Sequence, residues 1–238
     1  MQLNFSDTAS LLEARSESEL LQRVQLCTRT LGFDQCLLAF EYSPPQLPKR
    51  HHVLSGYPAA WQAEYGKQQY VEIDPTVAHC LSREDPVIWT EGLFLGEERR
   101  EALWETARGF GLGFGLSVPT HDKVGPVSSM FSVARDQGFS SGKELLEVIA
   151  GAKTIAAVAH VAACKLVLPI MAPSPPELTR RELEILKYIA IGKNRWEIAT
   201  ILALSESAVA FHTGNLLRKF DSSNRTQIAA KAIAFGLV

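Results

Sequence analysis

The sequence predicts an α+β protein in which helices flank a mainly antiparallel sheet, followed by a separate all-helical segment. Strand-like runs are grouped in the middle of the first 168 residues, with helical patterns before and after them. Prolines then cluster at positions 169, 173, 175 and 176. Because proline lacks an amide donor and has a fixed φ, such a cluster is typical of a linker. We therefore predict a domain over residues 1–168, a linker over 169–177 and a second domain over 178–238.

The first elements follow from apolar spacing. Leucines and valines recur at helical intervals over residues 6–31, and Ser16 can cap a second helical segment within that range. Residues 36–42 and 51–55 are short strand-type runs separated by a proline-rich loop. We expect these two strands to pair.

An aromatic stripe comes next. Tyr57, Trp61 and Tyr65 lie four residues apart, so they share one face of a helix. Such a stripe is typical of core packing, but its hydroxyls and indole N–H also suit a pocket that binds a polar group. Asp74 precedes Pro75 and is a candidate N-cap of the next helix.

The remaining elements of this domain alternate between strand and helix. Residues 86–90 are predicted as a bend or strand, and residues 96–110 as an amphipathic helix. The glycines of residues 109–115 do not match a dinucleotide-binding fingerprint, and in a strand they indicate close approach of backbone or ligand. A hairpin turning at residues 122–125 leads into a strand over 127–135, and a long helix over 140–168 follows.

Composition bounds the class of protein. The chain has 238 residues, a 46% hydrophobic fraction and a net charge of −2, as expected of a globular protein. Residues 175–238 hold 9 Lys/Arg against 6 Asp/Glu, and the rest of the chain holds 15 against 20. A basic tail behind an acidic front suits a regulatory domain joined to a nucleic-acid binder. The four cysteines lack ligand spacing, and no signal peptide or spanning apolar run is visible. We expect a cytoplasmic protein with no metal, no cofactor and no membrane contact.

The last domain contains a predicted helix-turn-helix. Ile198, Ile201 and Leu202 share one helical face, and a second helix beginning after Ser205 carries its own apolar face. The second helix of such a motif can enter the DNA major groove. With its motifs Leu178–Leu186, Trp196–Ala199 and Leu204–Ser207, this segment resembles the LuxR-type helix-turn-helix domain.

That resemblance implies a DNA-binding surface. We expect base contacts from the outer face of the second helix and phosphate contacts from the cations around it. The expected base-reading residues are Ser207, Ala210, Phe211 and Thr213, with Gly214 on the same groove-facing surface. The expected phosphate contacts are Lys193, Arg195, Arg218, Lys219 and Arg225, and Thr179 and Ser205 complete the expected DNA-binding set.

The first domain is similar to the autoinducer-binding domain of LuxR-type quorum-sensing receptors, particularly those for long-chain acyl-homoserine lactones. The similarity rests on Tyr57–Trp61, Tyr65, Asp74–Val77, Trp89 and Gly115. It implies an α-β-α sandwich with a pocket between sheet and helices. By this resemblance Trp61 donates to the lactone carbonyl, Asp74 accepts the amide N–H, and Tyr57 and Ser132 bind the acyl carbonyl. Trp89 packs on the lactone ring, Tyr65 borders the acyl chain, and Thr76 and Ser117 line the pocket.

Departures from the family pattern concern the ligand's tail. Gln62 stands where some long-chain receptors have arginine, which bears on recognition of a 3-oxo group. Glu41 lies near the expected acyl channel.

We therefore expect a regulator, not an enzyme, because no catalytic motif is present. The lactone should complete the front domain, and the ordered protein should form a homodimer that binds a palindromic operator. A ligand-independent anti-activator of the same fold is one alternative. A phosphorylation-dependent response regulator is another, although the chain lacks the acidic cluster and alternating βα pattern that this class needs.

Overall fold

The computed structural model describes residues 5–44, 47–122 and 126–238. Two compact units make up the chain: Met1–Tyr42 with Arg50–Met171, and Ser43–Lys49 with Ala172–Val238. The second unit takes in Ser43–Lys49, which the sequence analysis placed in the first domain, and each unit is described separately below.

The N-terminal unit is built on a five-stranded antiparallel sheet with the order β2-β1-β5-β4-β3. Leu37 on β1, the second strand in this order, pairs with Ser55 of β2 on one side and Ser132 of β5 on the other. The strands are β1 (Gln35–Tyr42), β2 (Arg50–Ser55), β3 (Val87–Ile88), β4 (Phe114–His121) and β5 (Val127–Arg135). The predicted pairing of the first two strands is confirmed.

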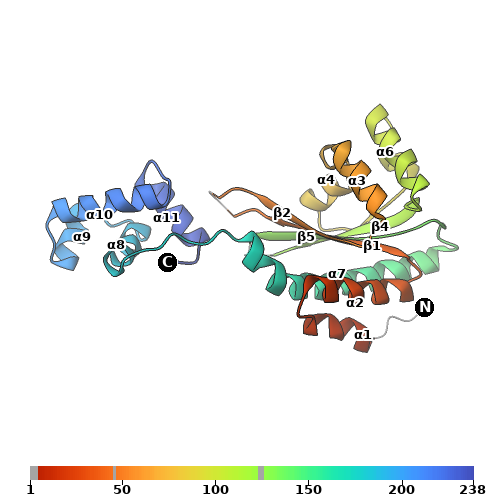
Figure 1. Ribbon diagram of the computed structural model, residues 1–238, viewed down its shortest axis with the longest axis horizontal. Coiled ribbons are helices and arrows are strands. Elements are labelled where there is room, and N and C mark those ends of the chain that lie inside the picture. Colours follow the sequence, from red (N-terminus) through yellow and green to blue (C-terminus); the bar gives the residue numbers. More distant parts are fainter. Residues whose placement is uncertain (1–4, 45–46, 123–125) are drawn as a thin grey trace. The chain divides into compact units, whose positions relative to one another are not determined.

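Helices cover both faces of the sheet, which confirms the expected α-β-α sandwich (Figure 1). One layer consists of α1 (Phe5–Ser10), η1 (Leu11–Glu13), α2 (Glu17–Thr30) and α7 (Gly142–Met171). The other contains α3 (Ala59–Lys67), η2 (Tyr70–Glu72), α4 (Pro75–Ser82), α5 (Glu91–Phe94) and α6 (Glu98–Gly109).

The strand pleat assigns side chains to the two layers. On β1 the even-numbered residues Cys36, Leu38, Phe40 and Tyr42 are buried. The same-facing Ser129 of β5 hydrogen-bonds His160 of α7, so this face lies against the first layer. The odd-numbered β1 residues are only partly buried and face the second layer. The sheet face toward the second helical layer is therefore less tightly packed than the face toward the first.

Two sequence predictions need correction. Helix α7 continues through Pro169 to Met171, so the linker begins at Ala172 rather than at residue 169. Proline removes one backbone hydrogen bond and strains the preceding turn, but only Ile170 and Met171 follow Pro169 in the helix, so little of α7 lies beyond the distortion. The short helix α5 was not predicted. The expected hairpin turn at 122–125 falls mostly outside the described residues.

Helix α7 is long and apolar enough to cross a membrane by length and composition alone. Its buried residues, among them Val148, Ile155, Ala159 and Val167, instead belong to the packed interior of this unit. The helix is thus a core element with one exposed face.

The C-terminal unit is a four-helix domain made of α8 (Arg180–Ala190), α9 (Arg195–Leu202), α10 (Glu206–Lys219) and α11 (Arg225–Ala234). Each helix starts at a side chain that accepts a backbone N–H: Thr179, Asn194, Ser205 and Asn224. Ala203 takes a left-handed conformation with φ of 51° and turns the chain between α9 and α10.

The core of this domain confirms most of the predicted helical faces. Ile198, Val209, Leu216 and Phe220 are buried together with residues of α8 and α11. Ile201 was expected in this core but is 47% exposed, because the inward face of α9 is formed by Ile198, Ala199 and Leu202.

Candidate functional site

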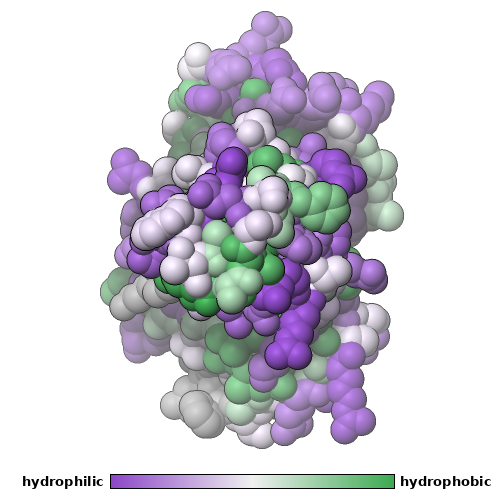
Figure 2. Space-filling model, turned by 90° about the vertical axis from the view of Figure 1, so that its left-hand side faces the viewer, coloured by the Kyte–Doolittle hydropathy of each residue, from purple (hydrophilic) through white to green (hydrophobic). Residues whose placement is uncertain are grey.

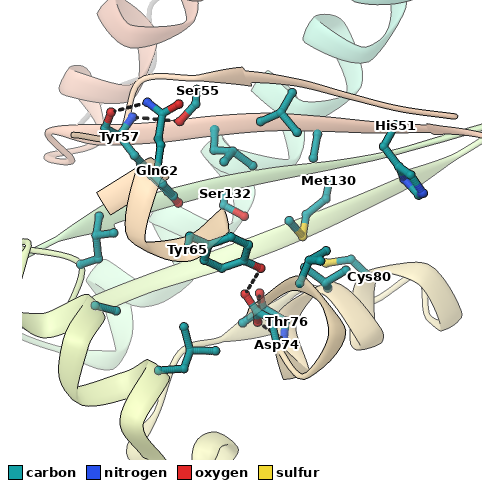
Figure 3. Close-up of a pocket in the computed structure, with 18 of the residues that line it drawn as sticks. His51, Ser55, Tyr57, Gln62, Tyr65, Asp74, Thr76, Cys80, Met130 and Ser132 are labelled. Atoms are coloured by element: carbon teal, nitrogen blue, oxygen red, sulfur yellow. Dashed lines mark hydrogen bonds between the residues drawn. The ribbon is translucent and has the colours of Figure 1, made fainter. Parts of the chain in front are cut away.

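A pocket of about 440 Å³ lies between the sheet and the second helical layer of the N-terminal unit. Figure 3 shows polar side chains gathered at one part of it. Of the eight predicted ligand contacts, seven line this pocket: Tyr57, Trp61, Tyr65, Asp74, Thr76, Trp89 and Ser132. Residues from β2, α3, α4, β5 and the β3 region therefore converge on one cavity.

The chain around the start of α3 positions the aromatic residues. Helix α3 begins at Ala59, so Tyr57 precedes it and does not share a helical face with Trp61 and Tyr65, as the sequence analysis had predicted. The Ser55 Oγ accepts the Tyr57 backbone N–H at 3.2 Å, and the Gln62 side-chain amide donates to the Tyr57 carbonyl at 2.7 Å (Figure 3). Trp61 is buried and its ring lies 5.6 Å from Tyr65 and 6.2 Å from Tyr70, centroid to centroid. These contacts fix the orientation of the Trp61 indole.

Asp74 combines a capping role with a place in the pocket wall. Its Oδ1 accepts the backbone N–H of Thr76 at 2.8 Å and the Thr76 hydroxyl at 2.7 Å, while its Oδ2 accepts the Tyr65 hydroxyl at 2.9 Å. Burial raises the pKa of the Asp74 carboxyl, and the hydrogen bonds from Thr76 and Tyr65 act in the opposite direction. An additional N–H donor at this carboxylate would stabilise its ionised form.

The Tyr57 hydroxyl is the least satisfied polar group of the pocket. It is buried and makes no hydrogen bond to the residues that the structure describes. Burial raises its pKa, the Cys36 and Asp74 side chains add to this effect, and the nearby Ser132 hydroxyl acts in the opposite direction without reaching hydrogen-bond geometry. A buried hydroxyl normally has a partner, so this one is a donor available to a molecule in the pocket.

Ser117 differs from its predicted role. It is fully buried and is not part of the pocket wall. Its Oγ accepts the Trp89 indole N–H at 3.0 Å and lies 2.8 Å from the Ser132 Oγ. Ser117 thus fixes the positions of Trp89 and Ser132 from outside the cavity.

Gly115 explains part of this arrangement. A Cβ atom there would lie 2.3 Å from the Val133 carbonyl oxygen and 2.8 Å from the Trp89 ring. Only glycine leaves room for Trp89 to lie flat beside β4, as the strand glycine suggested in the sequence.

The rest of the pocket wall is mostly apolar and was not predicted residue by residue. The β1 and β5 side chains Leu37, Ala39 and Met130 face α4 residues, including Cys80, and burial raises the pKa of the Cys80 thiol to about 12. In the structure, the partial burial of alternate β1 residues marks the sheet face that lines the cavity. The same alternation in a sequence would fit either a cavity wall or a packed core. Further wall residues are Val53, Val71, Val77, Leu81, Phe94, Leu103, Trp104, Ala107 and Leu112.

A second polar cluster lies on the α7 side of the sheet. The His160 Nδ1 is 2.7 Å from the Ser129 Oγ, and its Nε2 is 3.1 Å from Asp122 Oδ1 and 3.6 Å from Cys164 Sγ. Within the described residues, Asp122, His160 and Cys164 are close enough together to surround a metal ion. Their mutual hydrogen bonds already account for the arrangement. His160 and Cys164 are four residues apart on α7, but the sequence analysis did not single them out, and the distant Asp122 joins them only in the folded structure.

Four of the predicted base-reading residues, Ser207, Ala210, Phe211 and Gly214, share the outer face of α10. Thr213 lies toward the side of the helix, and its hydroxyl donates to the Val209 carbonyl at 2.8 Å. Ser207 and Phe211 are exposed, Phe211 at 65%, and Ala210, Thr213 and Gly214 are partly exposed. A Cβ added at Gly214 would meet no atom within 4 Å, so this face is open at its middle. Figure 2 views the end of the domain at which α9 lies, where a small apolar area is surrounded by hydrophilic side chains. The outer face of α10 is therefore accessible, and it carries little charge at its middle.

The predicted phosphate contacts fall into two groups. Arg195 and Arg218 are exposed, and the Arg218 guanidinium donates to the Asn215 side chain. Lys219, Arg225 and Lys193 have partners within the domain. Lys219 lies 2.8 Å from the buried Glu182 carboxylate and also donates to the Glu177 carbonyl. Arg225 donates to the Lys193 carbonyl, and Lys193 pairs with Glu197 at 2.7 Å.

The two caps in the predicted set, Thr179 and Ser205, begin helices α8 and α10. Thr179 forms a reciprocal capping box with Glu182. Burial pulls the pKa of Glu182 upward, but hydrogen bonds from Lys219 and Thr179 outweigh it, and the net pKa is lowered. Both caps are therefore built into the frame of the domain.

The fold and site together define a two-domain transcription regulator with a small-molecule pocket and a helix-turn-helix. Residues 16–163 match the family model described as "Autoinducer binding domain", and residues 176–232 match "Bacterial regulatory proteins, luxR family". The chain belongs to this luxR family and is a ligand-responsive DNA-binding regulator of the quorum-sensing type. The sequence-based resemblance is confirmed.

Curated relatives span nearly the whole chain. The transcriptional activator protein AnoR of Acinetobacter nosocomialis is 31% identical, covering 97% of this chain and 96% of its own length. The quorum-sensing regulator RhlR of Pseudomonas aeruginosa is 35% identical over 88% of this chain and 86% of its own. The first is named a transcriptional activator and the second a helix-turn-helix-type quorum-sensing regulator, in keeping with a regulatory role for the chain.

Solved structures agree with the fold. Escherichia coli SdiA superposes with a TM-score of 0.73 at 26% identity, covering 96% of this chain and 94% of that chain. A second solved structure, "SdiA in complex with octanoyl-rac-glycerol", matches with a TM-score of 0.71 at 26% identity and covers 100% of this chain and 98% of that one.

Proposed function

We propose that the effector is an N-acyl-homoserine lactone bound in the N-terminal pocket. The observation that carries this proposal is the buried Tyr57 hydroxyl, which has no hydrogen-bond partner among the described residues. Asp74 supplies an acceptor in the same pocket wall. An amide needs one donor for its carbonyl and one acceptor for its N–H, and these two side chains provide them.

The other polar residues suit the rest of the head group. Trp61 donates its indole N–H to the lactone carbonyl, Trp89 packs on the lactone ring, and Ser132 assists Tyr57 at the acyl carbonyl. The acyl chain then lies along the apolar wall past Met130 and Cys80. The octanoyl-glycerol complex of SdiA supports an acyl ligand for this fold.

Ligand binding couples to DNA binding through folding. A lactone fills the cavity and satisfies Tyr57, so it stabilises the native N-terminal domain. A ligand that binds only the native state contributes about 2.7 kcal/mol at 100 times its Kd. The ordered protein then forms a homodimer and binds a palindromic operator in the cytoplasm. A dimer related by two-fold symmetry carries two helix-turn-helix domains, and each of them binds one half-site.

DNA contact in this proposal divides between two sets of residues. The outer face of α10, with Ser207, Ala210, Phe211 and Gly214, reads bases together with Thr213 at its side. Arg195 and Arg218 contact phosphates, because both are exposed beside that face. Lys193, Lys219 and Arg225 join only if DNA releases them from their partners within the domain. We assign no catalytic residue and no cofactor.

Small-molecule mass spectrometry tests the effector class. The full-length protein is produced in cells supplied with a panel of acyl-homoserine lactones, purified, and its bound small molecules are extracted. We expect one lactone to be retained in stoichiometric amount by the wild-type protein and to be lost in Asp74→Asn. Retention of no lactone, with equal solubility in every culture, would contradict the proposal.

A further inference from the structure

Three side chains that can bind a metal meet between the end of β4 and helix α7. His160 and Cys164 are one turn apart on α7, and Asp122 follows the last residue of β4. One nitrogen, sulfur or oxygen ligand atom of each residue lies within 4.8 Å of the other two. Imidazole, thiolate and carboxylate are the ligand types that zinc binds in proteins. The cluster therefore has the composition of a zinc site with three protein ligands.

Two distances within the cluster are those of a tetrahedral zinc site. With Zn–N and Zn–O bonds of about 2.0 Å and a Zn–S bond of about 2.3 Å, a nitrogen ligand lies about 3.3 Å from an oxygen ligand and about 3.5 Å from a sulfur ligand. His160 Nε2 lies 3.1 Å from Asp122 Oδ1 and 3.6 Å from Cys164 Sγ. Both pairs are therefore already at the spacing that coordination requires.

Hydrogen bonds hold these atoms together in the metal-free protein but do not satisfy all of them. Nε2 of a neutral imidazole has either one proton or one lone pair, yet it faces both the Asp122 carboxylate and the Cys164 sulfur. A cation between the three atoms accepts a lone pair from each. His160 Nδ1 lies 2.7 Å from the buried Ser129 Oγ. A hydrogen bond from the second ring nitrogen orients a histidine toward a metal, and Ser129 is placed to accept it.

The cluster is buried at His160 and open at Asp122. The His160 side chain is 5% exposed and that of Asp122 is 39% exposed, so ions in solution reach the cluster from the Asp122 side. Cys164 lies between these two in exposure. Burial, together with the Asp122 charge, raises the pKa of the Cys164 thiol to about 11. The thiol therefore keeps its proton until a cation offsets both effects.

We propose that Asp122, His160 and Cys164 bind one zinc ion, which links the end of β4 to helix α7. The Cys164 thiol releases its proton to solvent, and a water molecule completes the coordination on the open side. The three ligands come together only in the folded N-terminal unit, so zinc stabilises that unit. The site is separate from the lactone pocket and does not depend on it. It departs from the sequence-based expectation of no metal, because one ligand is distant in sequence.

Zinc titration of the full-length protein, without a histidine tag, tests the site. The protein is stripped of metal and titrated with Zn²⁺ in competition with a chromophoric chelator. We expect one zinc ion per chain. Cys164→Ala and Asp122→Ala should each weaken binding at least about a hundredfold, because each removes a ligand. Ser129→Ala should weaken it about tenfold, the scale of losing a residue that orients a ligand.

Cobalt identifies the ligands directly. We expect Co²⁺ to give the visible bands of a four-coordinate ion and a thiolate-to-cobalt charge-transfer band in wild type, and the charge-transfer band to disappear in Cys164→Ala. Cys27→Ala is the matched control, because Cys27 is a buried thiol on α2 outside the cluster. It should keep both the zinc affinity and the spectrum.

Two results would overturn the proposal. One is a wild-type protein that binds no stoichiometric zinc. The other is equal zinc affinity in wild type, Asp122→Ala and Cys164→Ala, which would place the bound ion at other residues. Should Cys164→Ala fail to fold, Asp122→Ala decides alone, because its position is exposed: unchanged zinc affinity in that variant rejects the site.

Discussion

Two polar groups in the pocket wall lower the stability of the ligand-free domain. The Tyr57 hydroxyl is buried with no partner among the described residues, and the Asp74 carboxyl has a pKa raised by burial. Buried groups of this kind cost free energy that a bound ligand recovers. At the scale of single residues, the site is arranged for a molecule that donates one hydrogen bond and accepts another.

Tyr57→Phe separates stability from binding. Removing the hydroxyl deletes an unsatisfied buried group, so we expect the ligand-free protein to unfold at an equal or higher temperature. Affinity for the lactone should fall roughly tenfold, because its acyl carbonyl loses a donor. Calorimetry of unfolding and of binding measures both.

Tyr65→Phe is the control for this change. The Tyr65 hydroxyl donates to Asp74 in the free protein, so its loss should lower the unfolding temperature without ligand. If Tyr57→Phe also lowered that temperature and left lactone affinity intact, the Tyr57 hydroxyl would have a structural partner and no ligand role.

The raised pKa of Asp74 predicts that acid has opposite effects on ligand affinity and on the stability of the ligand-free protein. The ligand amide N–H binds the ionised carboxylate, so affinity should be constant above the raised pKa of Asp74 and fall as pH drops through it. A carboxyl whose pKa is raised on folding destabilises the native state above that pKa, and protonation relieves this effect. Acidification should therefore weaken lactone binding while the Asp74 contribution to the stability of the ligand-free protein improves.

Asp74→Asn tests the assignment of this pH dependence. Asparagine still caps α4 through its carbonyl oxygen, so the fold should be retained. Binding should be weak at every pH, and the step attributed to Asp74 should disappear. A parallel decline of affinity with pH in wild type and variant would place the titrating group elsewhere.

Helix α10 combines a face proposed to contact DNA with residues that stabilise the C-terminal domain. Its outer face is exposed, while Lys219 at its end is bonded to the buried Glu182 of α8. Arg218, one residue earlier, points outward and bonds only its neighbour Asn215 among the contacts described for it. Of these two adjacent cations, Lys219 therefore stabilises the domain, and Arg218 is available for contact with DNA.

Arg218→Ala and Lys219→Ala form a matched pair. We expect Arg218→Ala to weaken binding to all DNA sequences alike and to reduce the salt dependence of binding by about one ion. Lys219→Ala should chiefly lower the unfolding temperature, because it leaves the Glu182 carboxylate buried without its cation. Titrations of duplex DNA at several salt concentrations, with thermal unfolding alongside, distinguish the two. A change of sequence preference in Arg218→Ala would contradict the proposed phosphate role.

The elements were largely predictable because their signals are local. Caps such as Ser16, Asp74 and Ser205, the paired strand runs and the helical periodicity all depend on neighbours in sequence. The extension of α7 through Pro169 and the exposure of Ile201 were not predictable. Both depend on how the surrounding residues pack, which the local pattern does not record.

The same distinction applies to the site. Seven of the residues that the family resemblance named as ligand contacts line the cavity, whereas Ser117 lies behind its wall; their roles toward a ligand stay predictions. The Lys219–Glu182 pair joins residues of two helices, and no spacing in the sequence reveals it. Contacts between distant segments are therefore the part that required the structure.

At the scale of the whole molecule, two domains separate sensing from DNA contact. The N-terminal domain holds the ligand-sized cavity with the buried, unpartnered Tyr57 hydroxyl. The C-terminal domain has a small core with its four helices capped, and its one buried polar side-chain atom without a partner among the described residues is Nδ1 of His212. We therefore expect the lactone to act on the stability of the first domain and to control the second through dimer formation.

Thermal unfolding of the full-length protein over a range of lactone concentrations tests the central claim most directly. The account predicts that the unfolding transition of the N-terminal domain moves steadily upward as the concentration exceeds Kd, by the equivalent of about 2.7 kcal/mol at 100 times Kd. Tyr57→Phe should need a higher concentration for the same shift. An N-terminal transition that stays at one temperature with every lactone of the panel would contradict the account.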